Sequence, residues 1–83
     1  MNGPYFVAAR TITGTPNKAA IRRLVAEVRR IDADVEVVDF REPGTRQHKV
    51  WAERPNDGMQ DHPERRATNR RIYEAFEAAT LTR

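Results

Sequence analysis

Five segments whose apolar residues recur at strand or helix spacing follow one another along this chain, and their order restricts the folds open to it. The run YFVAARTI, residues 5–12, is apolar and of strand length, and its continuity predicts a strand buried on both faces. A helix is expected next, because an apolar stripe at helical spacing extends to about Ile31. We expect Thr15 to cap this helix and Pro16 to be its first residue.

The second half of the chain predicts a hairpin followed by a second helix. Residues 34–40, DVEVVDF, and residues 48–53, HKVWAE, have the composition of strands, and the EPGT sequence between them suits a type II turn. Two apolar phases within DVEVVDF indicate a bulge or burial on both faces. Asp61 and Glu64 have the spacing of a capping box, from which a helix is expected to run to about Ala79.

The order β-α-β-β-α is typical of an α+β two-layer sandwich, in which a three-stranded sheet carries both helices on one face. This order resembles that of a ferredoxin-like or RNA-recognition-motif domain that lacks its last strand. The resemblance is confined to the order of the elements, because the third strand, HKVWAERP, lacks the glycine and the aromatic-rich composition of the RNA-recognition signature. The length predicts one small α/β domain over residues 1–83.

If the strands pair in the ferredoxin-like order, the missing fourth strand leaves the first strand at the edge of the sheet. An apolar edge strand exposes unpaired backbone groups to other chains. The tail ATLTR could cover this edge with a very short strand, a second copy of the chain could pair with it, or a partner could add a strand. Because few residues remain after the last helix, we expect a homodimer through the first strand or a protein partner.

Composition argues against several classes of chemistry. The chain has no cysteine, which removes disulfides and thiolate metal sites, and no serine, so the common nucleophilic triads are absent. No segment approaches the roughly 20 apolar residues of a membrane span, and the N-terminus lacks the pattern of a signal peptide. We therefore expect a non-enzymatic protein of the cytoplasm that binds no cofactor and no membrane.

One group of side chains is chemically suited to a metal ion, namely Asp57, Asp61, His62 and Glu64. Carboxylates and imidazoles are ligands of Mg²⁺, Mn²⁺ and Zn²⁺. Their spacing matches no known ligand pattern, and turn and capping roles account for the three carboxylates. We therefore predict no metal and no catalytic residue here. The sequence alone does not decide whether these four side chains bind a metal ion.

The arginines offer one candidate surface. The net charge of +3 is modest, but thirteen of the fifteen basic residues are arginine, which suits phosphates and carboxylates better than lysine does. The last helix reverses the preferred order of charges, since its arginines precede its glutamates. A phosphate-contacting helical face is one interpretation, and a solvated face is the favoured one. The candidate nucleic-acid contacts are Arg22, Arg29, Arg65, Arg66, Arg70 and Arg71.

The tryptophan of the third strand is the other candidate. If Val50 and Ala52 face the helices, Trp51 points to the open face of the sheet between Lys49 and Glu53. Acidic neighbours favour an anchor for a protein interface over a platform for nucleic-acid bases. A structural alternative is that the indole only covers the small sheet, together with Tyr5 or Phe6.

The sequence as a whole favours a small adaptor or inhibitor that binds another protein through the open sheet face and the apolar first strand. Nucleic-acid binding through the arginine-rich helical face is the alternative. The candidate partner-binding residues are Tyr5, Val7, Lys49, Trp51 and Glu53.

Overall fold

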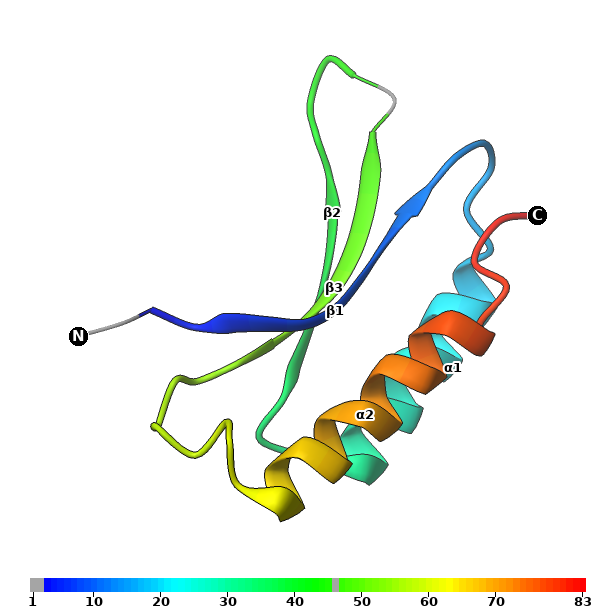
Figure 1. Ribbon diagram of the computed structural model, residues 1–83. Coiled ribbons are helices and arrows are strands. Elements are labelled where there is room, and N and C mark those ends of the chain that lie inside the picture. The colour runs from blue at the N-terminus through cyan, green and yellow to red at the C-terminus, as the bar shows by residue number, and fades with distance from the viewer. Residues whose placement is uncertain (1–2, 46) are drawn as a thin grey trace.

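The computed structural model describes residues 3–45 and 47–83, which form one three-stranded antiparallel sheet and two helices in the order β-α-β-β-α. The elements are β1 (Tyr5–Ile12), α1 (Lys18–Ile31), β2 (Glu36–Arg41), β3 (His48–Arg54) and α2 (Pro63–Ala78). Both helices lie side by side on one face of the sheet, and no described element covers the other face (Figure 1). The predicted α+β sandwich is therefore confirmed.

The strand order is β1-β3-β2, so β3 lies in the centre and β1 forms one edge. This confirms that the apolar first strand becomes an edge strand when a fourth strand is missing. The C-terminal tail pairs elsewhere, because Thr82 forms a bridge with Pro16 in the loop before α1, where the tail and this loop lie close together (Figure 1). Within the described chain, no strand pairs with the outer edge of β1, which is therefore open to another chain.

The core lies between the sheet and the two helices. β3 turns Val50 and Ala52 toward the helices, and both side chains are fully buried. The helices contribute Leu24 and Val28 of α1 and Phe76 of α2. Alternate side chains of β3 are thus divided between the core and the uncovered face, as the strand period predicts.

The turn between β2 and β3 agrees with the prediction. Gly44 has a φ of +79°, the left-handed conformation that the third position of a type II turn requires. The Thr45 N–H donates to the Glu42 carbonyl at 3.3 Å and closes the turn.

The start of α1 differs from the prediction, which placed the cap at Thr15. Asn17 is the cap, and its Oδ1 accepts a hydrogen bond from the Ala20 N–H at 3.1 Å. The Asn17 N–H donates to the Leu81 carbonyl at 2.8 Å. This contact with the tail holds the backbone around Pro16 in an extended bridge, so the helix cannot begin there.

The predicted capping box at the start of α2 is wrong. His62 is the cap residue and makes no side-chain capping hydrogen bond, and Pro63 is the first residue of the helix. The residue before a proline is restricted to extended backbone, and His62 has φ −67° and ψ 135°. The proline therefore sets the boundary at His62, one residue after the predicted cap Asp61.

β1 is not buried on both faces as its unbroken apolar run indicated. Ala8 and Ile12 are buried in the core, whereas Phe6 is 66 % exposed, and the register with β3 shifts between Phe6 and Ala8. The register of β2 with β3 is regular along its length, so the two apolar phases there reflect no bulge. The second phase, Val38 and Phe40, lies on the uncovered face of the sheet.

A buried arginine at the end of β3 ties the sheet to both helices. Arg54 is 1 % exposed, its Nη1 lies 2.7 Å from Asp32 Oδ2, and its Nε donates to Asn69 Oδ1 at 2.9 Å. Asn69 Nδ2 in turn donates to the Tyr5 hydroxyl at 3.3 Å. Burial raises the pKa of Asp32, but the Asp34 N–H and the Arg54 guanidinium outweigh burial and lower that pKa below its ordinary value.

A second arginine offsets the unfavourable order of charges in α2. Arg10 Nη1 of β1 donates to the carbonyls of Phe76 at 2.6 Å and Ala79 at 3.2 Å. α2 has no basic residue in its last turn, so Arg10 supplies the cation that the negative end of the helix dipole favours.

Candidate functional site

Three aromatic side chains, one from each strand, form a row across the uncovered face of the sheet. The Trp51 ring lies between Phe6 and Phe40, with ring centroids 5.9 and 6.1 Å away and planes tilted by 55° and 57°. Phe6 is 66 % exposed and Phe40 is 46 % exposed. Tilted rings at these distances attract one another. We call Phe6, Trp51 and Phe40 the aromatic row.

The register of the sheet creates this row. Trp51 is opposite Ala9 of β1 and Val38 of β2, and the two phenylalanines occupy positions diagonal to it. Diagonal neighbours in a sheet lie within reach of aromatic side chains. Because Ala9 and Val38 are smaller than the rings, the phenylalanines can lean toward the indole from both sides.

Charged side chains border the aromatic row. Glu53 Oε1 accepts a hydrogen bond from Trp51 Nε1 at 2.7 Å, which satisfies the polar atom of the indole. Glu36 is the cross-strand partner of Glu53 at one end of the row, and Lys49 is the partner of Phe40 at the other end. An apolar centre with a polar rim is the composition of many protein interfaces.

The structure brings together only part of the predicted partner-binding set. Lys49, Trp51 and Glu53 share the uncovered face, as the alternation of β3 predicted. Tyr5 and Val7 lie on the edge strand but face the helices, because the Tyr5 hydroxyl bonds to a side chain of α2 and Val7 packs against the core.

Sequence reasoning did not include Phe6 and Phe40 in the site. The sequence feature that pointed to Phe40 was the alternation of Val38 and Phe40 in β2. Because β2 has no bulge, these two residues form an apolar patch on the uncovered face. The sequence indicated Phe6 only as one of two residues that could cover the sheet with Trp51, and it could not choose between Phe6 and Tyr5, because the register shift between Phe6 and Ala8 changes which residues of β1 face outward. A shift of this kind is not visible in an unbroken apolar run.

Two of the six arginines predicted to contact nucleic acid are held by carboxylates. Arg65 donates to both oxygens of Asp57 at 3.0 and 3.1 Å, and this hydrogen bonding lowers the pKa of Asp57. Arg70 pairs with Glu74 at 3.1 Å across one helical turn. These contacts support the favoured interpretation of a solvated, ion-paired face for this part of α2.

The arginines are also divided between two edges of the molecule. Arg22 lines a hollow together with residues of β2, whereas Arg66 and Arg70 line a hollow beside β1. Since β1 and β2 are the two edge strands, these hollows lie at opposite edges of the sheet. Arg29 and Arg71 are exposed on α1 and α2, and the six side chains do not share one hollow.

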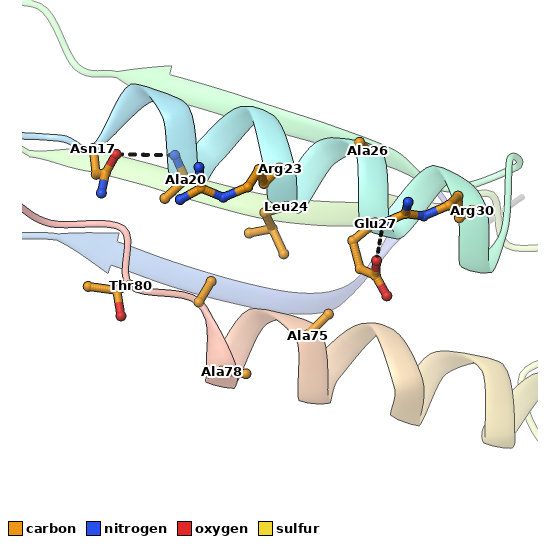
Figure 2. Close-up of a pocket in the computed structure, with 11 residues that line it drawn as sticks. Asn17, Ala20, Arg23, Leu24, Ala26, Glu27, Arg30, Ala75, Ala78 and Thr80 are labelled. Carbon is orange, nitrogen blue, oxygen red and sulfur yellow. Dashed lines mark hydrogen bonds and ion pairs between the residues drawn. The ribbon is translucent and has the colours of Figure 1, made fainter.

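A groove of about 780 Å³ runs between α1 and α2 (Figure 2). Figure 2 shows short side chains along it, among them Ala26, Ala75 and Ala78. The charged pair at one end, Glu27 and Arg30, is already joined by a hydrogen bond. This groove offers space but no convergent set of polar groups that would select a ligand.

The described residues contain no group of three or more His, Asp or Glu side chains arranged to hold a metal ion. Of the four side chains considered for a metal site, Asp57 is bonded to Arg65 and to the Met59 N–H. In the part of the chain that the structure describes, no helix has both the length and the apolar character that crossing a membrane requires.

The chain matches no known protein family, and no curated protein or solved structure is significantly similar to it. The aromatic row and its charged border are therefore the features on which a function can be based.

Proposed function

We propose that this chain is a small, non-enzymatic binding protein of the adaptor or inhibitor type that binds another protein through the aromatic row. The observation that carries this proposal is the exposure of Phe6 and Phe40 beside Trp51 on an uncovered sheet. Burying a large apolar side chain is worth about 1.5–3 kcal/mol, so a partner that covers the row gains affinity from each ring. Aromatic anchors of this kind contribute most of the binding energy in many interfaces.

The charges around the row favour a partner with a basic group. Glu36 and Glu53 are directly opposite each other and, together with Asp34, line a small hollow at one end of the row. Like charges at directly opposite positions of a sheet are destabilising. A lysine or arginine of the partner placed there would relieve this repulsion, while its apolar side chains cover the rings.

The open edge of β1 adjoins the row at Phe6, so an extended segment of a partner could pair with β1 and continue onto the rings. A second copy of the chain is one such partner. Lys49 and the Glu36–Glu53 pair lie at opposite ends of the row, and a two-fold axis through Trp51 would bring opposite charges together.

Nucleic-acid binding is the second candidate function, and one observation favours it. Arg66 and Arg70 line a hollow with Tyr73, whose side chain is 51 % exposed. Arginines beside an exposed aromatic ring are typical of sites that bind phosphates and stack bases. Lys49 is the only cation on the face of the aromatic row among the described residues, which makes the helical side the better place for such contacts.

Affinity capture tests the proposal. We expect immobilised protein, presented to a nuclease-treated extract of the organism that encodes it, to retain a protein that the Phe6→Ser/Phe40→Ser variant loses. Loss of two aromatic anchors should weaken binding by at least about 2 kcal/mol, roughly 30-fold. Quantitative mass spectrometry of the retained proteins measures the effect, and circular dichroism checks that the variant is folded.

Tyr73→Ser is the matched control, because it removes an exposed aromatic side chain from the helical side. The proposal requires this variant to retain the same protein as the unmodified chain. Equal losses with both variants, or no retained protein that depends on Phe6 and Phe40, would contradict it. Retention of nucleic acid from an untreated extract that depends on Tyr73 and Arg66 would support the second candidate instead.

A further inference from the structure

A basic hollow lies on the helix-covered side of β2, away from the aromatic row. Lys18 and Arg22 of α1 and Arg41 of β2 line it together, and its volume is about 590 Å³. Pockets for small molecules have volumes of roughly 300–1,000 Å³. The three side chains are exposed, and none of the ion pairs between described residues involves them.

The carboxylate in this hollow is already engaged by a histidine. Asp39 Oδ1 contacts His48 Nε2, and both residues line the hollow. Three cations and one carboxylate leave the hollow with a net charge of +2 when His48 is neutral. The charge of the hollow therefore selects anions.

His48 places a buried polar atom beside the three cations. The residue is only 8 % exposed, and its Nδ1 has no hydrogen-bond partner among the described residues. Buried polar atoms are nearly always satisfied, and exceptions commonly mark a bound water, ion or functional group. The Nε2 that contacts Asp39 is a donor, because a carboxylate only accepts, so Nδ1 of the neutral ring is an acceptor that cannot bond to a phosphate oxygen. A water held beside a bound phosphate would satisfy it.

The backbone adds to the positive potential. The hollow includes Thr15, Pro16 and Lys18, which lead into the first turn of α1. The N-terminus of a 14-residue helix carries a partial positive charge from the aligned peptide dipoles, and phosphate groups bind readily at such ends.

We propose that this hollow binds the phosphate group of a small phosphomonoester. Arg22 and Arg41 present planar guanidinium groups that can each bind two phosphate oxygens, and Lys18 adds a point charge. The doubly charged phosphomonoester matches the net charge of the hollow. Arg41 follows Phe40 in β2, but alternate side chains of a strand face opposite ways, so this site is separate from the aromatic row and does not depend on the proposed protein binding.

Calorimetric titration tests the proposal with three probes: inorganic phosphate, adenosine monophosphate and a dinucleotide joined by one phosphodiester. We expect saturable binding of the first two and weaker binding of the dinucleotide, whose phosphate carries one charge. Arg22→Gln and Arg41→Gln should each weaken binding of adenosine monophosphate at least 10-fold. Asp39→Asn should tighten it, because it removes the negative charge in the hollow.

Arg29→Gln is the control, since it removes the same charge from an exposed position on α1 that does not line the hollow. Its affinity for adenosine monophosphate should equal that of the unmodified protein. The proposal is overturned if the unmodified protein shows no saturable binding at low salt, or if Arg29→Gln weakens binding as much as Arg22→Gln. Equal affinity for the dinucleotide would also overturn it and would assign the hollow to nucleic-acid phosphates.

Discussion

Arg54→Ala should lower the free energy of unfolding by about 3–5 kcal/mol, because it breaks a buried ion pair and leaves its partners unsatisfied. Arg54 is nearly inaccessible to solvent and contacts Asp32 at the end of α1 and Asn69 within α2. A domain of 83 residues has a free energy of unfolding of roughly 4–12 kcal/mol in total. The variant should therefore lose a large share of its stability, and urea denaturation followed by circular dichroism measures the loss.

The pH dependence of stability gives a second measure of the same pair. The pKa of Asp32 is lower in the folded protein than its ordinary value of 3.8. A lowered folded-state pKa contributes stability above the unfolded pKa, and this contribution is lost as the pH falls through the folded pKa. Asp32→Asn should thus be less stable than the unmodified protein at neutral pH and should lose less stability on acidification below 3.8.

Two outcomes would contradict this account of the pair. One is Arg54→Ala with unchanged stability, and the other is an acid profile that Asp32→Asn leaves unaltered. The pKa of Asp57 is also lowered, by its contact with Arg65. Asp32→Asn leaves this contact in place, so the difference between the acid profiles of the two proteins reports on Asp32.

Phe76→Ala should lower the free energy of unfolding far more than Phe6→Ala, although both remove the same side chain. Phe76 is fully buried between the sheet and the helices, and its truncation should cost about 3–5 kcal/mol through lost burial and a cavity. Phe6 is mostly exposed, and its truncation should cost less than about 1 kcal/mol. Urea denaturation of both variants under the same conditions measures the difference.

This pair of variants separates folding from function. If Phe6 is dispensable for stability, its position on an uncovered face is explained by binding rather than by packing. A loss of 2 kcal/mol or more with Phe6→Ala, roughly what large core truncations cost, would show that the ring is a part of the fold and would weaken the case for a binding surface.

The order of the elements could be predicted because it follows from local patterns, and the edge position of β1 could be predicted because that order resembles a ferredoxin-like domain without its last strand. Apolar spacing distinguishes strands from helices, and a missing strand leaves its neighbour at the edge. The starts of the helices could not be predicted in the same way. Asn17 caps α1 because the distant Leu81 holds the preceding backbone. At the start of α2, Pro63 restricts His62 to extended backbone, so the helix begins after His62 although Asp61 and Glu64 have the spacing of a capping box.

Of the candidate sites, the sequence predicted the parts that depend on alternation within a single strand. Trp51 faces outward because Val50 and Ala52 face the core. The rest depends on contacts across strands and layers. The expected third strand ends at residue 53, one residue before Arg54, which is the most buried charged residue described. The hollow at Arg22 forms only when α1 packs beside β2.

Quenching of Trp51 fluorescence shows whether a partner covers the aromatic row, because Trp51 is the only tryptophan of the chain and lies in the middle of the row. The measurement compares acrylamide quenching of the free protein with that of the protein bound to the partner purified by affinity capture. The partner must contain no tryptophan, or its tryptophans must be replaced by a non-fluorescent tryptophan analogue. The protein alone at increasing concentration tests a second copy as the partner. We predict that binding shields Trp51 and lowers the quenching constant several-fold. A partner that binds while the quenching constant stays unchanged would contradict the proposal that the aromatic row is the binding surface.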